Sequence, residues 1–248
     1  MPSPTLTPPR PPSERGVHQG RPYWLWLPEG EGPWPAILIL HGAGSRKENH
    51  ADFARLCAAA GWVALAYDQR GHGESADEMD PGALADVGRM ARFLAERPDV
   101  DGARVCVRGS SMGGNLAIHA AATSPSIAGA IAICPAGEEQ LLRGVRSGDF
   151  AFRAGERARE ELAAWLAEHD LREAVALVAP KPLILLHARG DERVPASLSE
   201  ELHARAGAPK KLIVVPGGHH RSVQHDAELQ GTALHWLERN LPAHTPGA

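Results

Sequence analysis

The stretch from Ala103 to Ala122, ARVCVRGSSMGGNLAIHAAA, decides the fold of this chain. It opens with a short apolar run, Val105-Cys106-Val107, which is typical of a strand buried on both faces. It then turns through residues 109–114 and continues into residues that favour a helix. Strand, Gly-x-Ser-x-Gly turn and helix together form a nucleophile elbow, in which a serine at a strained turn exposes its hydroxyl above the sheet. The pattern marks Ser111 as a nucleophile.

The glycines of this turn have a steric purpose. Strand and helix almost touch at the elbow, so the residues two before and two after the serine must be very small. The alternative is a glycine-rich turn whose serine only caps the helix. The partner residues found further along the chain favour the catalytic interpretation. We expect the neighbouring Ser110 to pack beside the turn.

Composition bounds the class of protein. The chain has 248 residues, 43% hydrophobic and 23% charged, which suits one large α/β domain. Its formal net charge of −4 gives no reason to expect a nucleic acid or an anionic membrane as partner. No apolar stretch approaches the length of a membrane span. Residues 1–20 are rich in proline, have no apolar core like that of a signal peptide, and predict a flexible tail.

The three cysteines, Cys57, Cys106 and Cys134, lie in apolar strand or helix contexts. Their odd number and the absence of a C-x-x-C pair predict buried free thiols, without a disulfide framework or a zinc site. We therefore expect a reducing compartment, the cytoplasm. The H-E-x-x-H pattern of zinc hydrolases is also absent, and no metal or other cofactor is expected.

Apolar runs alternate with helical segments over residues 21–245, and we interpret this span as one domain. Runs of strand length recur at 23–27, 36–40, 62–67, 105–107, 127–134, 183–187 and 211–215. This rhythm predicts a mostly parallel sheet covered by helices on both faces. The polar loop over residues 68–75 follows one of these strands. We interpret its charges as fixing the loop by hydrogen bonds rather than as catalytic groups.

The rhythm breaks between residues 136 and 178, where the chain is charged and helical. We interpret this segment as an insertion of about two helices that forms a lid over the mouth of the sheet. Phe150, Phe152 and Trp165 are the candidates for an apolar, substrate-binding wall beneath it. The alternative is a solvated excursion packed on a flank.

Three further positions follow strand ends, where a site can form. Asp191 could orient an imidazole, although an aspartate there could also serve only a turn or a helix N-cap. The small-residue loop after residue 40 could present the backbone N–H of Ala43, and the N–H of Met112 follows the nucleophile. Together these two donors would form an oxyanion hole.

The order Ser111, Asp191, His220 resembles the nucleophile–acid–histidine order of α/β-hydrolases. The segments HGAG, DQRGHGES, GSSMGG, RGDERVP and PGGHHRS are similar to loops of that superfamily. They are most similar to its dienelactone-hydrolase and prolyl-oligopeptidase-like esterase branches. Two adjacent histidines, His219 and His220, occupy the loop of the catalytic histidine, and the resemblance of that loop selects His220.

The resemblance implies an α/β-hydrolase fold with a helical lid and a Ser-His-Asp triad that cleaves a small or medium carboxylic ester through an acyl-enzyme. The expected partner is a small-molecule ester or acyl substrate, with no nucleic acid or membrane. The same triad could serve a peptidase, a thioesterase, an acyltransferase or a carbon–carbon hydrolase. A non-catalytic ligand-binding protein on the same scaffold is the alternative from another class. The physiological substrate and the oligomeric state stay open.

Overall fold

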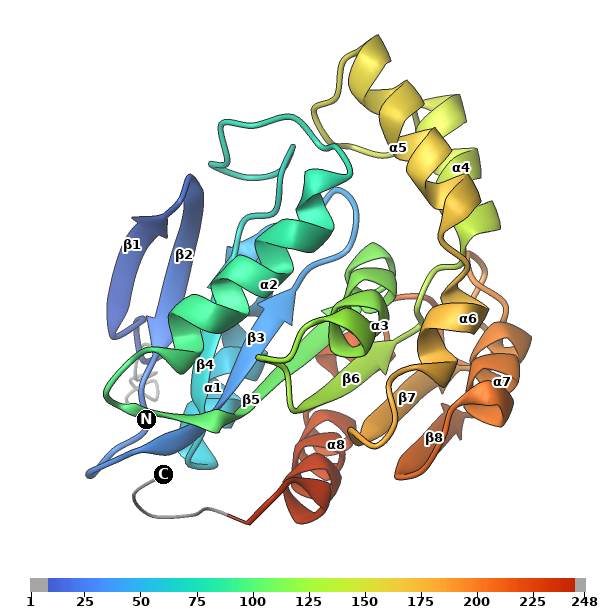
Figure 1. Cartoon of the computed structure of the whole chain (residues 1–248). Coiled ribbons are helices and arrows are strands. Elements are labelled where there is room, and N and C mark those ends of the chain that lie inside the picture. Colours follow the sequence, from blue (N-terminus) through green and yellow to red (C-terminus); the bar gives the residue numbers. More distant parts are fainter. Residues whose placement is uncertain (1–8, 244–248) are drawn as a thin grey trace, which may run out of the picture.

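An eight-stranded sheet forms the centre of the molecule in this computed structural model, which describes residues 9–243 (Figure 1). Across the sheet the strands follow the order β1-β2-β4-β3-β5-β6-β7-β8. Their bounds are β1 Glu14–His18, β2 Arg21–Trp26, β3 Trp34–Leu40, β4 Val63–Tyr67, β5 Val100–Ser110, β6 Gly129–Ile133, β7 Leu183–Ala188 and β8 Lys210–Val215.

The strands from β3 onward run parallel to one another, whereas β1 and β2 pair antiparallel at one end of the sheet. Parallel strands end at the same edge, so the loops after β3, β5, β7 and β8 meet there. This edge is where ligands bind in open α/β sheets. The topology therefore brings together segments that are far apart in the sequence.

Helices cover both faces of the sheet, and this layering explains why the strand runs are apolar throughout. One core lies between the sheet and α2, α3, α6 and α7, while a second lies between the sheet and α1 and α8. Their bounds are α1 Ala51–Ala59, α2 Gly82–Ala95, α3 Met112–Thr123, α6 Leu171–Ala176, α7 Ala196–Arg205 and α8 Ala227–Asn240. Short 3₁₀ turns, η1 Lys47–His50 and η2 Val223–His225, precede α1 and α8. The predicted α/β sheet with helices on both faces is confirmed.

The predicted flexible tail over residues 1–20 is wrong for part of its length. Residues 14–18 form β1, which pairs with β2, and the backbone N–H of Ser13 donates to the carbonyl of Leu25. Pro12 is the last proline within residues 1–20, so residues 13–20 keep the N–H groups that a sheet ladder needs. Residues 1–8 of that tail and residues 244–245 of the predicted domain lie outside the described residues.

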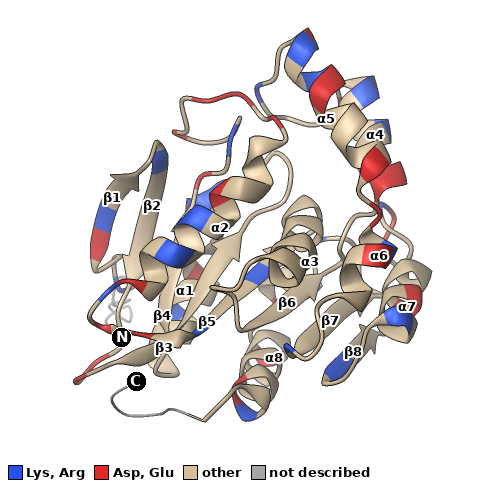
Figure 2. Ribbon diagram, viewed as in Figure 1, with Lys and Arg blue, Asp and Glu red and all other residues tan. Residues whose placement is uncertain are grey.

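The segment over residues 136–178 contains α4 Glu138–Ser147, α5 Glu156–Glu168 and α6 Leu171–Ala176. In Figure 1, α4 and α5 project beyond the ends of the strands, whereas α6 lies against the body of the molecule. Charged residues are dense on α4 and α5 and sparse on the central strands (Figure 2). Arg159 of α5 donates to the carbonyl of Val145 on α4, which joins the two projecting helices.

A buried ion network fixes the polar loop over residues 68–75. Lys47 is 1% exposed, and its ammonium lies 2.7 Å from the Asp68 carboxylate and 2.5 Å from that of Glu74. Asp68 also accepts hydrogen bonds from the backbone N–H groups of Lys47 and Glu74. This loop therefore has the structural role that the sequence predicted.

Within residues 9–243, no helix combines the length and the apolar character that crossing a bilayer requires.

Candidate active site

Ser111 lies between the end of β5 and the start of α3, in a backbone conformation that few residues adopt. Its φ is 54° and its ψ is −117°, which is strained for a residue with a side chain. Its N–H donates to the carbonyl of Ile133, and its carbonyl accepts from the N–H groups of Asn115 and Ala136. These bonds to β6 and its following loop hold the strained turn in place.

Two glycines permit this turn because their neighbours leave no room for a side chain. A Cβ on Gly109 would lie 1.9 Å from the carbonyl oxygen of Gly113. A Cβ on Gly113 would lie 2.5 Å from the carbonyl oxygen of Leu40, on β3. The close approach of strand and helix is therefore the physical reason for both glycines.

Asp191 and His220 are joined by a hydrogen bond although 29 positions separate them. Nδ1 of His220, in the loop after β8, lies 2.7 Å from Oδ2 of Asp191, in the loop after β7. The other carboxylate oxygen of Asp191 accepts from the backbone N–H groups of Arg193 and Val194. The acid is thus oriented by its own loop before it meets the histidine.

A second histidine lies on the buried side of Asp191. His187, the penultimate residue of β7, is fully buried, with Nε2 3.4 Å from Oδ2 of Asp191 and Nδ1 2.7 Å from the hydroxyl of Ser199. Burial alone would raise the pKa of Asp191. The hydrogen bonds with His187, His220 and the backbone outweigh it and hold the pKa well below its usual range. Asp191 is therefore a carboxylate at any neutral pH.

His219 faces its own loop instead. Its Nδ1 accepts from the backbone N–H of Arg221, and its own N–H donates to the hydroxyl of Ser222. Of the two adjacent histidines, His220 is the one that contacts Asp191.

The thiol of Cys134 lies close to the same pair. Ligand atoms of Cys134, Asp191 and His220 all fall within 4.8 Å of one another, a spacing that could hold a metal ion. The hydrogen bond between Asp191 and His220 already accounts for the proximity of those two side chains. The imidazole nitrogen facing Asp191 is engaged by the carboxylate, so the chemistry of the set is that of an acid and its histidine.

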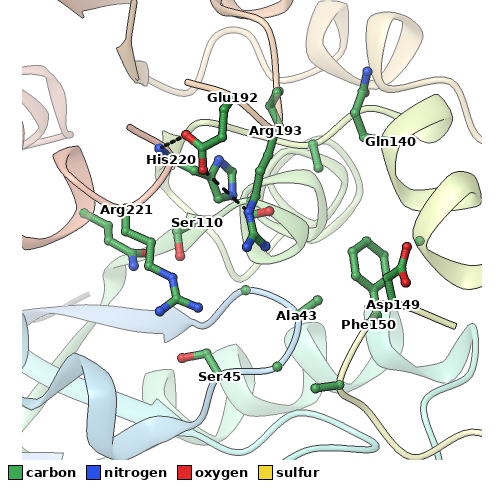
Figure 3. Close-up of a pocket in the computed structure, with 18 of the residues that line it drawn as sticks. Ala43, Ser45, Ser110, Gln140, Asp149, Phe150, Glu192, Arg193, His220 and Arg221 are labelled. Atoms are coloured by element: carbon green, nitrogen blue, oxygen red, sulfur yellow. Dashed lines mark hydrogen bonds and ion pairs between the residues drawn. The ribbon is translucent and has the colours of Figure 1, made fainter. Parts of the chain in front are cut away.

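Ser111 and His220 both line a pocket of about 890 Å³. Figure 3 shows this pocket with His220 at its wall. Its walls come from the loop after β3, the elbow, α4 with the segment that follows it, and the loops after β7 and β8. Neither Oγ of Ser111 nor Nε2 of His220 has a hydrogen-bond partner within residues 9–243, and both residues line this pocket. Both groups are therefore available to a ligand.

The expected oxyanion-hole donors also lie beside Ser111. Ala43 lines the pocket, and a Cβ on the preceding Gly42 would lie 3.4 Å from the Cβ of Ser111. Met112 is the first residue of α3, whose first N–H groups have no intrahelical acceptor. In the described part of the chain, no carbonyl or side chain accepts from the N–H of Ala43 or Met112.

Comparison with known proteins identifies the fold. The model of a family described as serine aminopeptidase, S33, matches residues 32–147. The solved structure of a 2,6-dihydroxy-pseudo-oxynicotine hydrolase superimposes with a TM-score of 0.77 at 25% identity, covering 93% of this chain and 68% of that one. The chain has the α/β-hydrolase fold.

Two further similar proteins were found, one by its sequence and one by its structure. An uncharacterized protein of Mycobacterium tuberculosis is 29% identical over 199 residues, which are 79% of this chain and 66% of the relative. The chain thus matches just under two thirds of that relative's length. Est1E of Butyrivibrio proteoclasticus, solved with ferulic acid, has a TM-score of 0.74 at 18% identity and covers 92% of this chain and 99% of its own, which supports the fold. None of these matches tests the narrower resemblance to the dienelactone-hydrolase branch, which stays a prediction.

The three aromatic residues predicted to form a substrate-binding wall in this hydrolase lie in different places. Phe150, in the segment between α4 and α5, lines the pocket (Figure 3). Phe152 is 7% exposed and packs behind it, with ring contacts to Phe150 and His72. Trp165 faces α3, where it contacts His119, and stacks on His169. Placing Trp165 in the pocket wall was wrong, because α5 turns that face toward α3.

The sequence alone did not predict that His187, Arg193 and Arg221 lie at the site. His187 ends an apolar strand run four residues before Asp191, and that position was the available signal. Arg193 and Arg221 stand two residues and one residue after Asp191 and His220, so their nearness to the site follows once those two residues are placed.

Proposed function

We propose that this hydrolase cleaves a carboxylic ester through an acyl-enzyme formed on Ser111, with His220 as base and Asp191 as its acid partner. The observation that carries the proposal is the 2.7 Å hydrogen bond between His220 and the buried Asp191, at a pocket that also holds a serine in a strained elbow. Strained backbone of this kind marks functional sites.

The first step is proton transfer from Ser111 to His220 as the serine attacks the carbonyl. With Nδ1–H donating to Asp191, Nε2 carries the free electron pair that can accept this proton. Asp191 stabilises the imidazolium without taking the proton, which its depressed pKa favours. His220 then protonates the leaving alcohol.

The tetrahedral intermediate carries its negative charge on the former carbonyl oxygen. The N–H groups of Ala43 and Met112 would donate to this oxygen, and the N-terminal end of α3 adds a favourable dipole. Water activated by His220 then hydrolyses the acyl-enzyme and frees Ser111. These steps balance without a metal or another cofactor.

The pocket supports a small or medium polar acyl group. Phe150 and Val194 are its only large apolar side chains among the lining residues, and charged or amide groups form much of the rest. A long hydrocarbon chain would lie against these polar groups and leave them without water. Carboxylesterase activity on short esters is therefore the proposed reaction.

The proposed location is the cytoplasm, and the proposed partner is a small molecule. All three cysteines are buried and free, which supports a reducing compartment.

The test combines a covalent probe with two substrate panels. A fluorophosphonate should label Ser111 alone, and Ser111→Ala should lose both labelling and turnover while its unfolding curve stays close to wild type. Ser147→Ala, at the end of α4 and outside the pocket, is the matched control and should keep both. Esters of graded acyl length should be cleaved faster than a parallel panel of peptides. Full activity in Ser111→Ala would refute the serine mechanism, and faster peptide cleavage would make the protein a peptidase.

A further inference from the structure

Positive charge gathers at the pocket of a chain whose net charge is −4. Three arginines line the pocket, Arg143 from α4, Arg193 from the loop after β7 and Arg221 from the loop after β8. Two acids, Asp149 and Glu192, line it as well. The net charge of the Arg, Asp and Glu side chains that line the pocket is therefore opposite in sign to the net charge of the whole chain.

Among the described residues, the partners of these charges leave one of the three pocket guanidinium groups, that of Arg221, unpaired. Glu192 accepts from the backbone N–H of His220 and lies 3.7 Å from Nε of Arg193, so it is already engaged. Arg143 is held 2.8 Å from Glu139, one turn away on α4. Within residues 9–243, the guanidinium of Arg221 has no ion-pair or hydrogen-bond partner.

The directions of the pocket side chains favour binding of an anion. In Figure 3, the guanidinium groups of Arg193 and Arg221 both extend toward the middle of the pocket, near Ala43 and Ser45. Asp149 stands beside Phe150 on the opposite side from Arg221. An anion in the middle of the pocket would thus lie near both guanidinium groups and on the opposite side from Asp149.

The position of the two arginines along the chain limits how far the anion can be from the reacting carbonyl. Arg221 directly follows the proposed base, and Arg193 stands two residues after the proposed acid. Consecutive Cα atoms are about 3.8 Å apart, so both side chains start close to the reacting atoms. The planar guanidinium fork matches a carboxylate with two parallel hydrogen bonds.

We propose that the substrate carries a carboxylate a few bonds from the scissile ester carbonyl, and that Arg221 and Arg193 bind it. The inference rests on the proposed ester hydrolysis and names its substrate class. The carboxylate can belong to the acyl part, as in a monoester of a short dicarboxylic acid, or to the leaving group, as in a carboxylated phenol.

The test uses neutral and anionic esters of matched length. Ethyl hydrogen glutarate is compared with ethyl pentanoate for an acyl carboxylate, and 4-carboxyphenyl acetate with phenyl acetate for a leaving-group carboxylate. One of the two anionic esters should have a kcat/KM about tenfold above its neutral partner at low salt. This preference should vanish as salt rises from about 0.01 M to about 1 M, over which the screening length falls from about 30 Å to about 3 Å.

Variants assign the preference to the arginines. Arg221→Gln should lower the ratio of anionic to neutral kcat/KM about threefold to tenfold, and Arg221→Lys should retain part of it because the charge remains. Arg157→Gln removes a guanidinium that is 91% exposed on α5, outside the pocket, and should leave the ratio unchanged. The ratio cancels any change in folding, since both esters meet the same protein.

A binding measurement separates failure of this inference from failure of the proposed function. Calorimetry with Ser111→Ala should detect ethyl hydrogen glutarate or 4-carboxyphenyl acetate binding more tightly than the neutral partner, and Arg221→Gln should remove that difference. If neutral esters are hydrolysed as fast as both anionic ones, and bind as tightly, the carboxylate site is refuted while the hydrolase remains. If the anionic ligand binds through Arg221 but no ester is cleaved, the proposed reaction fails and the anion site stands.

Discussion

The loops at the strand ends and the projecting helix α4 line the same pocket, but these loops and the projecting helices α4 and α5 are held differently. Ser111, Asp191 and His220 are fixed by backbone hydrogen bonds and by the buried carboxylate. On α4 and α5 the ion pairs are exposed, such as Arg143–Glu139 and Arg157–Glu161. Exposed pairs of this kind contribute little to stability because solvent screens them.

This difference separates two tasks within one pocket. A reacting group has to stay within about 0.5 Å of its productive position, which buried hydrogen bonds can ensure. A wall that only selects the substrate can be changed without moving the sheet. We therefore expect substitutions at the strand ends to change the rate or the fold. Substitutions on the pocket side of α4 and in the segment between α4 and α5 should change the choice of substrate.

The largest effect should come from the pair of adjacent histidines at the strand-end region. His220→Ala should lower kcat by about 10⁴-fold or more, because it removes the base that contacts Asp191. His219→Ala, its neighbour in the same loop, should keep a substantial fraction of activity. Single-turnover kinetics on a short ester measures both. The reverse pattern would move the base to His219.

The next effect concerns the scaffold beneath the strand ends. Lys47→Met would leave the Asp68 carboxylate buried without its cation, and we expect unfolding free energy to fall by about 3–5 kcal/mol. Arg46→Met is the control one residue away, since Arg46 is 63% exposed and lies 3.6 Å from Glu48. It should cost less than about 1 kcal/mol. Urea unfolding measures both, and equal losses would contradict a buried network.

A smaller effect, dependent on pH, should appear where α5 rests on α3. Burial, with the nearby His169, lowers the pKa of His119 to about 4, below the value of about 6.5 in the unfolded chain. As pH falls, the unfolded chain binds this proton first, so stability is full above about pH 6.5 and declines toward about pH 4. Relative to His119→Phe, the wild type should lose about 2 kcal/mol between about pH 7 and about pH 5.

Thermal or urea unfolding across this pH range provides the measurement for His119. His235→Phe replaces an exposed histidine on α8 and should leave the pH slope as in the wild type. Identical slopes for the wild type and His119→Phe would mean that the contact between His119 and Trp165 does not hold the two helices together as described.

The smallest effect should be a change of substrate selectivity, caused by substitutions in the segment between α4 and α5. Phe150→Ala should change the relative rates across an ester series by about threefold to tenfold, because Phe150 lines the pocket. Trp165→Ala should leave relative rates unchanged and lower stability, since Trp165 faces α3. A shift in acyl preference with Trp165→Ala would put α5 at the substrate.

Most of the sheet was predictable because its strands are buried on both faces. Runs such as residues 36–40 and 183–186 are apolar without interruption, and polar loops with Gly, Asp or His follow each one. The edge strand β1 was missed, since its residues alternate between half-buried and exposed and follow a proline-rich segment. An edge strand of this kind leaves little apolar signal.

The candidate site was also predictable in one part and not in another. Asp191 and His220 follow predictable strand ends, so their meeting depends only on the parallel order of β7 and β8. The direction of a side chain on α5 depends instead on how that helix rotates against α3. Ala158, Leu162, Trp165 and Leu166 share one apolar face of α5. The sequence does not say whether that face meets α3 or the pocket, so Trp165 could not be placed.

At position 111, the stability of the fold and the proposed catalysis favour different residues, because the backbone conformation there is strained. A φ of 54° with a ψ of −117° costs a residue with a side chain about 1–3 kcal/mol, a cost that glycine largely avoids. Selection for a stable fold alone would therefore replace Ser111 by glycine. A descendant of this chain that no longer needed turnover could gain stability by the same change that destroys its nucleophile, so loss of activity here would be hard to reverse.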